Sequence, residues 1–596
     1  MPGLNMQATL PVPEFVPINI NIIYSMQNPV DGIQFVISMD AYPYCTWDFE
    51  FVIPRYLEQQ ESAPEDDGEL LEGDNSTIVV CSGELVEQVA HSCNSSKTIF
   101  MFSQNTSTSV QHIAFAAGPF HVHSISADLS ATEDVSGTSQ PLMHVFYFPG
   151  HESLLGTFVS FMRSAMSFYS TEFRSYPFGL HKLIFVDEML TQWFDSATLS
   201  LITVDLLQGK DAIDQVLKIR HCLSHALACQ WIGINIQQKT WSDTWLMNRL
   251  GLYITGLFIW KLMRNHEYRF RLKKDMECML ELDNGFMSPI CQPQLFEPPD
   301  PVTLAFINLK SPLILHILDR HLGKSGTSLE LSRVLLKVFL SAISGELPNN
   351  TLSTHLFLRT CRKVSGIDPH SFAEQWIYGS GCPMFGFSAT FNCKKMVVEI
   401  SMHQEAPAFK VHENNEVTKV LMKPAAVLFF EGQMTIHIHE ADGMPYEHIL
   451  NIRSSYKCYE VPFNTKYKRV RQNTKQYLAC QAAAQATAEG DAEAVAAMNM
   501  VNMGFVTDWT EEDEQNMAGQ MYEWIRINTG FEWIAAIAFD QKDYMWVSQL
   551  QRDRDVGAQY EAIQVLLKTP NAMISSTFAK TVLVSNYYFQ IHCEAS

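Results

Sequence analysis

The residues with the clearest chemical potential are His225 and Cys229, which lie four positions apart in an apolar segment. Positions i and i+4 share one face of a helix, so an imidazole and a thiolate at this spacing can bind the same Zn²⁺. A hydrolytic zinc helix reads His-Glu-x-x-His, and its Glu is the general base. Here Ala226 stands where the base would be, and Cys229 stands where the second His would be. We therefore expect a packed core His beside a buried thiol rather than a working metal site.

The elements that position this pair are predicted from the hydrophobic period. In the first 150 residues apolar positions alternate with a period of two, which indicates β-strands. These strands are predicted at 17–24, 32–39, 46–53, 78–81, 98–102, 112–116 and 144–148. The period then becomes helical, with helices predicted at 153–173, 213–234, 244–264, 303–322, 328–344 and 351–364, and one buried strand at 183–186.

Strands return after residue 383 and helices return after residue 543. The strands are predicted at 384–393, 396–402, 418–430, 433–439, 448–461, 524–527 and 531–534. A β-rich part, a helical part and a β-sandwich in this order indicate a multidomain α+β fold. We expect residues 464–520 to be a disordered or partly helical excursion from the sandwich, because they are rich in Ala, Gln and Glu.

Length and composition limit the class of protein. A chain of 596 residues is too long for one core and predicts three to five domains. The net charge of −22 argues against a general affinity for nucleic acid, which needs Lys and Arg to replace phosphate counterions. The thirteen Cys contain no CxxC pair, and we expect no leader peptide and no membrane span. This pattern fits a reducing cytosolic or nuclear compartment.

Two charged segments are candidates for contact with partners. A basic run suits contact with DNA phosphates, a nuclear import signal, or neutralisation of the acids at 511–514. This run comprises Lys466, Lys468, Arg469, Arg471 and Lys475. The acidic segment 58–74 is expected to be a solvated insertion, with protein docking as the alternative.

An amphipathic pattern follows at residues 544–556. It predicts the first helix of a stacked repeat, which buries one face against its neighbours. The apolar face comprises Met545, Trp546, Leu550 and Val556. Three polar residues are expected to help seat the helix on the sandwich, namely Gln549, Arg552 and Arg554.

Three motifs in order resemble those of the zinc aminopeptidases with a thermolysin-like catalytic domain. The zinc helix of that family continues as Gln-Trp-x-Gly, here residues 230–233. Its third zinc ligand is a Glu within Trp-x-Asp-x-Trp-Leu-Asn-Glu, and the matching residue in segment 241–248 is Asn248. The third motif combines residues 373–376 with residues 379–383. The same register places His221 one turn before the ligand face, although its spacing to His225 leaves an alternative metal pair open.

The resemblance implies that the chemistry of those enzymes is absent here. Two of the three ligand positions are changed, and the base is lost. The family's Gly-x-Met-Glu-Asn loop, which grips the substrate amine, is missing between Asp187 and Leu201. The Tyr that stabilises the oxyanion in the family should fall near Asn308, and no Tyr stands there.

A closer resemblance is to the family of TFIID subunit 2 proteins (TBP-associated factor 2), which are non-catalytic relatives of those enzymes. It is carried by residues 222–228, 241–243 and 544–556, and it covers nearly the whole chain outside 464–520. It implies an N-terminal β-domain (1–149), a thermolysin-like pseudo-catalytic domain (150–385), a β-sandwich (386–540) and the first helices of a HEAT/ARM-like repeat (541–596). By this resemblance the N-terminal domain is shortened, and the helical repeat stops after one or two helices.

The resemblance also implies a function. It predicts a nuclear, non-catalytic scaffold and core-promoter-recognition subunit of TFIID that supports assembly of the RNA polymerase II preinitiation complex, without a cofactor or a membrane. The implied partners are histone-fold TFIID subunits, the largest subunit, TBP indirectly, and core promoter DNA around the initiator. Two alternatives stay open: a zinc aminopeptidase with the ligands His225, Cys229 and Asn248, and a pseudoenzyme that binds a peptide in the old cleft. Loss of the base disfavours the first, since general acid–base catalysis contributes about 10²–10⁴-fold.

Overall fold

The computed structural model describes most of the chain outside five longer segments. The described residues are 4–10, 18–24, 45–55, 76–125, 141–207, 212–323, 330–405, 427–440, 444–464 and 521–596, except positions 175, 188, 190, 284–286, 294, 296 and 585–586. The predicted strand 32–39, the acidic segment 58–74 and the basic run at 466–475 lie outside the described residues.

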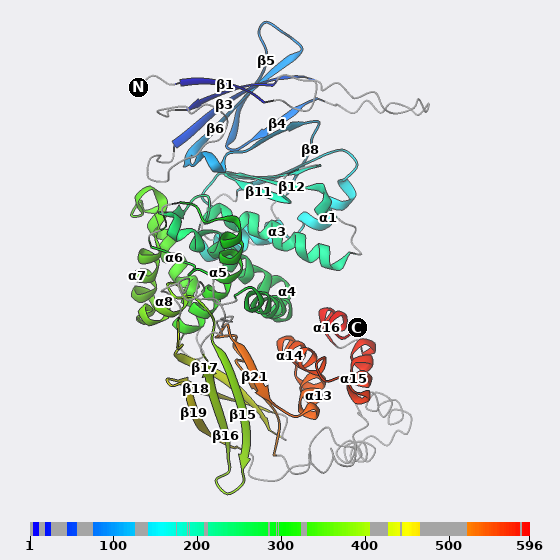
Figure 1. Ribbon diagram of the computed structural model, residues 1–596. Coiled ribbons are helices and arrows are strands. Elements are labelled where there is room, and N and C mark those ends of the chain that lie inside the picture. Colours follow the sequence, from blue (N-terminus) through cyan, green and yellow to red (C-terminus); the bar gives the residue numbers. More distant parts are fainter. Residues whose placement is uncertain are drawn as a thin grey trace, which may run out of the picture. The chain divides into compact units, whose positions relative to one another are not determined.

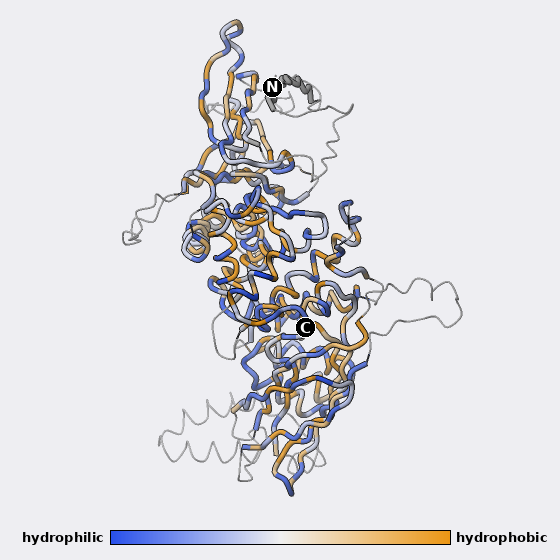
Figure 2. The backbone as a smooth tube through the Cα atoms, turned by 90° about the vertical axis from the view of Figure 1, so that its left-hand side faces the viewer, coloured by the Kyte–Doolittle hydropathy of each residue, from blue (hydrophilic) through white to orange (hydrophobic). Residues whose placement is uncertain are grey.

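The chain divides into two compact units, which are described in turn. Unit 1 comprises residues 1–259, 293–298 and 330–367. Unit 2 comprises residues 260–292, 299–329 and 368–596. Figure 2 shows hydrophobic and hydrophilic residues interspersed along the backbone, as expected where strands and helices have one face in a core.

The first sheet of unit 1 is antiparallel, with strand order β1-β2-β3-β6-β5 (Figure 1). Its strands are β1 (Leu4–Leu10), β2 (Ile18–Tyr24), β3 (Cys45–Pro54), β5 (Glu84–Ala90) and β6 (Lys97–Thr108), and a separate pair is formed by β4 (Ile78–Cys81) and β7 (Phe115–Gly118). The predicted alternation is observed in β3, where Trp47 and Phe49 are buried and Asp48 is exposed. The predicted strand 112–116 is wrong at its start, because residues 110–112 form a 3-10 turn whose last C=O accepts a hydrogen bond from the backbone N–H of Ala197.

The second sheet of unit 1 has the order β11-β12-β10-β9-β8. Its strands are β8 (His121–Ser124), β9 (Leu142–Tyr147), β10 (Leu180–Val186), β11 (Trp193–Ser196) and β12 (Leu199–Thr203). β9, β10 and β12 run parallel, while β8 and β11 run antiparallel to their neighbours. β11 is therefore one edge of this sheet, and it also packs against α3 (Ile213–Trp231).

The helices of unit 1 depart from the predicted ones at two points. Two helices, α1 (Glu152–Val159) and α2 (Met162–Phe173), replace the single predicted helix 153–173. Phe158, Val159 and Met162 are buried on both sides of the turn. The spacing of the apolar residues therefore does not reveal where the first helix ends. α4 (Thr244–Leu282) continues past the predicted end at Arg264, whose backbone is non-helical with φ 68°. The other helices of the unit are α6 (Glu330–Ile343) and α7 (Thr354–Ser365).

Unit 2 contains two sheets, with strand orders β19-β16-β15-β21 and β18-β17-β20. The strands are β15 (Met384–Asn392), β16 (Val397–Glu405), β17 (Gly432–Glu440), β18 (Pro445–Ile452), β19 (Tyr456–Pro462), β20 (Tyr522–Ile527) and β21 (Ala536–Asp540). The predicted strand 448–461 is two strands in different sheets, because a turn at residues 453–455 separates β18 from β19. Residues 427–430 are not part of a strand, in contrast to the prediction, and residues 531–534, which were predicted as strand or extended sequence, are not a strand.

The helices of unit 2 include one that resembles a membrane span by length and composition. They are α5 (Pro301–Leu322), α8 (His370–Trp376), α13 (Asp543–Arg552), α14 (Val556–Leu566), α15 (Ala572–Leu583) and α16 (Phe589–Ala595). Within the described residues α5 alone is long and apolar enough to span a membrane, a point that the sequence analysis does not anticipate. More than half of its apolar stretch is buried, and it carries the buried Lys310 and Asp319, as a core helix does.

The burial of α13 differs from the predicted amphipathic pattern. Every residue from Tyr544 to Leu550 is buried. The helix is therefore enclosed on all sides within unit 2, and a single apolar face is not an adequate description of it.

Candidate functional site

The predicted pair comes together on one face of α3. Cys229 Sγ lies 3.4 Å from Nε2 of His225 and 3.8 Å from its Nδ1. Nδ1 of His225 also lies 3.5 Å from Oγ1 of Thr255 on α4. α4 can approach this closely because residue 251 is glycine, where an added Cβ would lie 3.3 Å from Cε1 of His225. The two helices thus enclose one small polar cluster.

Both members of the pair are uncharged at neutral pH. Burial, together with the charges of His221 and Arg249, lowers the pKa of His225 to about 3. Burial also raises the pKa of the Cys229 thiol well above its usual value. The contact is therefore between a neutral imidazole and a thiol, whereas a zinc ligand must be a thiolate.

The other predicted site residues are only partly visible. Ala226 is fully buried in α3 and has no group that can carry a proton. Asn248 lies in α4, but its side chain is outside the described residues. Among the described residues, no group of three or more His, Cys, Asp or Glu side chains is arranged to hold one metal ion. The degenerate ligand positions therefore stay a prediction.

Arg249 is a site residue that the sequence motifs do not indicate. It follows Asn248 directly, and its side chain is only 8% exposed. Its Nε has no hydrogen-bond partner among the described residues. Burial lowers the pKa of Arg249 to about 10, and the neighbour that opposes this effect is the Cys229 thiol rather than a carboxylate. The signal in the sequence is an arginine one residue after the position of the third ligand.

A carboxylate on β11 faces the same cluster. Asp195 raises the pKa of the thiols of Cys222 and Cys229 on α3, so its side chain lies on the α3 side of the strand. Burial raises the pKa of Asp195 to about 6, and its Oδ1 has no hydrogen-bond partner among the described residues. Trp193 is two residues earlier on the strand and therefore shares this face, where it is 39% exposed.

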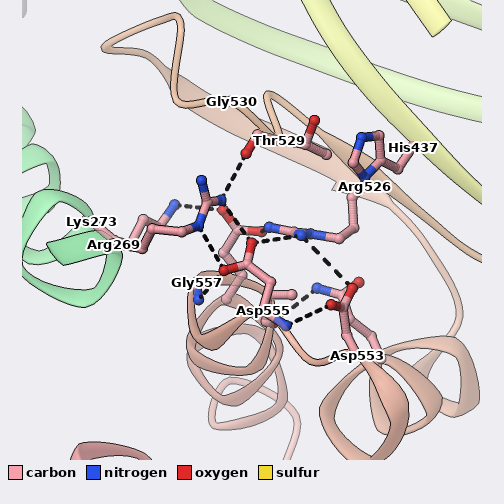
Figure 3. Close-up of polar contacts among 12 residues, drawn as sticks. Arg269, Lys273, His437, Arg526, Thr529, Gly530, Asp553, Asp555 and Gly557 are labelled. Atoms are coloured by element: carbon pink, nitrogen blue, oxygen red, sulfur yellow. Dashed lines mark hydrogen bonds and ion pairs between the residues drawn. The ribbon is translucent and has the colours of Figure 1, made fainter. Parts of the chain in front are cut away.

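A second polar cluster, within unit 2, joins β20, α4 and the C-terminal helices (Figure 3). Arg526 of β20 is buried, and its Nη1 lies 2.8 Å from Asp555 and 3.7 Å from Asp553. Asp555 also accepts two hydrogen bonds of 2.7 Å from Arg269 of α4. These carboxylates neutralise a guanidinium that would otherwise be costly to bury.

This second cluster differs from the contacts predicted between α13 and the sandwich. Gln549 donates a hydrogen bond to the C=O of Ala558 in α14, and Arg554 is exposed. Asp553 contacts the sandwich, since it also accepts a hydrogen bond from Trp524 of β20, and the predicted role of Arg552 stays a prediction. Arg and Asp alternate in this run, and the sequence does not show whether the positively or the negatively charged side chains face the interior.

Comparison with known proteins shows which proteins the chain resembles. The chain is similar to transcription initiation factor TFIID subunit 2 of Schizosaccharomyces pombe, with 35% identity over 100% of this chain and 57% of that protein. Over its whole length the chain therefore resembles the TFIID subunit 2 proteins. Members of that family from Saccharomyces cerevisiae and Drosophila melanogaster are 29% and 23% identical over 87% and 97% of this chain, and over 41% and 47% of those proteins. Residues 380–542 also match the family model described as the TAF2 Ig-like domain.

The fold of this TFIID subunit 2 relative is aminopeptidase-like. The crystal structure of Legionella pneumophila aminopeptidase A in complex with aspartic acid superposes with a TM-score of 0.61 and covers 87% of this chain and 51% of that chain. Since the sequence identity is 11%, this likeness concerns the fold alone. The predicted multidomain α+β fold is confirmed at that level. The chain spans about 57% of the length of the S. pombe family member.

Proposed function

We propose that this chain is a nuclear, non-catalytic subunit of TFIID that acts as a scaffold and in recognition of the core promoter. The observation that carries the proposal is the 35% identity with S. pombe TFIID subunit 2 over the whole chain. Its partners would be the histone-fold subunits, the largest subunit and, indirectly, TBP. Its role would be to support assembly of the RNA polymerase II preinitiation complex.

The site between α3 and α4 supports the non-catalytic part of the proposal. Ala226 lacks a basic group, and Arg249 adds a positive charge beside His225 and Cys229. A fixed cation disfavours Zn²⁺ nearby because like charges repel, most strongly where little water screens them. We therefore propose that His225, Cys229 and Asn248 are degenerate ligand positions and that the chain uses no cofactor.

We propose further that the four predicted parts, 1–149, 150–385, 386–540 and 541–596, are the domains of the chain. The last would begin a HEAT/ARM-like helical repeat. In support, α13 packs on α14 and α15 packs on α16, and stacked helix pairs are the units of such repeats.

Contact with promoter DNA is proposed for the basic run that contains Lys466, Arg469 and Lys475. Charge is its only support, since Lys and Arg displace phosphate counterions. Replacement of all five basic residues of the run by Gln should reduce the salt dependence of DNA binding in gel-shift titrations. An unchanged salt slope would remove the run from the proposal.

The test of the function is affinity purification of the tagged chain from nuclear extract, followed by mass spectrometry. TFIID subunits should co-purify in near-stoichiometric amounts, and a mock purification with the tag alone should recover none. Recovery of the chain without any TFIID subunit would contradict the proposal. Stoichiometric zinc together with chelator-sensitive cleavage of aminoacyl substrates would instead support the zinc aminopeptidase alternative.

A further inference from the structure

We propose that Thr569, in the turn between α14 and α15 of unit 2, is a phosphorylation site for a proline-directed protein kinase. The Oγ of Thr569 attacks the γ-phosphorus of ATP, the bond from that phosphorus to the β–γ bridging oxygen breaks, and ADP leaves. The hydroxyl proton passes to a carboxylate base of the kinase. This inference goes beyond the proposed function and does not rest on it, because the reaction can be measured on the purified chain.

The first argument is the sequence around Thr569. A proline-directed kinase phosphorylates Ser or Thr where Pro follows directly, and Pro570 follows Thr569. Pro also disfavours helical backbone at the residue before it, which biases Thr569 toward the extended conformation that a kinase binds. The whole sequence contains two other pairs of this kind, at residues 288–289 and 311–312. The sequence pattern alone therefore leaves three candidates.

The fold occludes the other two candidates. Ser311 is fully buried inside α5, where its hydroxyl donates a hydrogen bond of 2.7 Å to the C=O of Ile307. Ser288 is half-buried, and Pro289 and Ile290 after it are buried. A kinase has to enclose residues on both sides of the reacting hydroxyl. Neither serine can therefore be presented without unfolding its surroundings.

The turn around Thr569 is open to a kinase. Residues 567–572 are all exposed. The backbone N–H groups of Lys568 and Thr569 donate to carbonyl groups at the end of α14 at 3.1 and 3.2 Å. Exposed hydrogen bonds at a helix end open at little cost. Beyond Pro570, which has no N–H to donate, Asn571 is already extended with φ −145° and ψ 171°.

The surroundings of Thr569 also suit the product. A phosphate adds a charge of about −1.5 to −2 at pH 7. Residues 562–593 include Lys568 and Lys580 but no Asp or Glu, although the whole chain has a net charge of −22. Thr569 also lies two residues before Asn571, the N-cap of α15, and the N-terminus of a helix carries partial positive charge. The added charge therefore falls where the local charges oppose it least.

The experiment incubates the full, folded chain with ATP and a purified cyclin-dependent kinase, and locates phosphate by mass spectrometry. Synthetic peptides with the sequences around Ser288, Ser311 and Thr569 are treated in parallel. The Thr569 peptide and the folded chain should both be phosphorylated at Thr569. The folded chain should carry no phosphate on Ser288 or Ser311, even where the corresponding peptides are substrates.

Variants then assign the reaction to the turn. Thr569→Val removes the hydroxyl and should abolish incorporation of phosphate, whereas Thr569→Ser should retain it. Pro570→Ala keeps the hydroxyl and should lower the rate severalfold or more. Ser288→Ala is the matched control and should leave the rate unchanged. Because Thr569 and Pro570 are both exposed, their variants are expected to keep the fold.

The stability of the phosphorylated chain tests whether the turn accommodates the charge. Thermal unfolding should occur at a temperature no lower than that of the unmodified chain, since the phosphate lies beside Lys568 and near the positive end of α15. A lower unfolding temperature would contradict the second part of the argument.

Three further outcomes overturn the proposal. If the Thr569 peptide is phosphorylated but the folded chain is not, the turn is closed to the kinase. If the Thr569 peptide itself accepts no phosphate, its sequence is not recognised. Incorporation that persists unchanged in Thr569→Val would assign the reaction to another residue.

Discussion

Nη1 of Arg526 lies 2.8 Å from the carboxylate of Asp555, which also accepts two hydrogen bonds from the Arg269 guanidinium. Burial alone would raise the pKa of Asp555, but Arg526 and Arg269 hold it well below its usual range. The Asp555 carboxylate therefore links strand β20, helix α4 and the start of α14 within unit 2.

Asp555→Ala is predicted to destabilise unit 2 by about 3–5 kcal/mol, because it leaves two guanidinium groups without their shared partner. The measurement is chemical denaturation of the full chain. Asp540→Ala is the matched control, since Asp540 is exposed on β21, and it should change stability by no more than about 0.5 kcal/mol. Equal stability of the two variants would show that the cluster contributes no net free energy.

Arg249→Met is predicted to stabilise the chain by at least about 1 kcal/mol, because it removes a buried charge that lacks a described partner. Lys310→Met is the matched contrast. Lys310 Nζ lies 3.0 Å from Asp283, and both side chains are buried, so removal of this cation should destabilise by about 3–5 kcal/mol. Thermal unfolding measures both. Destabilisation by Arg249→Met would mean that the guanidinium is already well paired.

Restoring the lost ligands is predicted to be insufficient for zinc binding. The triple variant Ala226→Glu, Cys229→His and Asn248→Glu keeps the charge of Arg249 beside the site, and this charge repels Zn²⁺. Addition of Arg249→Ala should allow the site to bind about one zinc per chain, as a three-ligand site does. Metal analysis after dialysis distinguishes the two variants. Zinc in the triple variant alone would show that Arg249 does not oppose the metal.

The pH dependence of stability is predicted to include His316 in unit 2. Burial, together with the charge of Arg320, lowers the pKa of His316 to about 3. Tyr268 donates a hydrogen bond to Nδ1 at 2.9 Å, and Nε2 donates one to the C=O of Gly530 at 3.3 Å, so the neutral ring satisfies both nitrogens. The unfolded chain takes up a proton near pH 6.5. This contribution to stability is thus complete above pH 6.5 and is lost as the pH falls from 6.5 toward 3.

His316→Gln tests this dependence. Between pH 4 and 6 it should reduce the slope of unfolding free energy against pH by about 1.4 kcal/mol per unit, which corresponds to one proton. His370→Gln is the control, since His370 is exposed, and it should leave the slope unchanged. A slope that does not change in His316→Gln would mean that other groups take up the proton.

Local sequence patterns predicted some elements at nearly their observed bounds. β3 was found because its apolar residues alternate, and α3 was found because His225 and Cys229 have helical spacing, although every residue from Cys222 to Trp231 is buried. The second segment of α4, after Arg264, was missed because its core-facing residues are interleaved with charges that pair inside unit 2, such as Arg269 and Lys273. Whether a charged side chain is buried likewise depends on partners that are distant in the sequence. A short window of sequence does not contain both partners.

The candidate site was predicted in the same partial way. The contact between His225 and Cys229 follows from helical spacing alone, and it was found. Arg249 and Asp195 were not found, because they come from other elements and only the tertiary packing brings their charges to the pair. The burial and the missing hydrogen-bond partner that distinguish Arg249 are properties of the folded chain.

The parallel pairing of β21 with β15 has a consequence for synthesis on the ribosome. Met384 lies opposite Ala536, so one edge of β15 stays open until more than 150 residues have been added after it. An open strand edge is a template for pairing with other chains. The growing polypeptide is therefore most exposed to aggregation during this interval, and chaperone binding is expected to be greatest there.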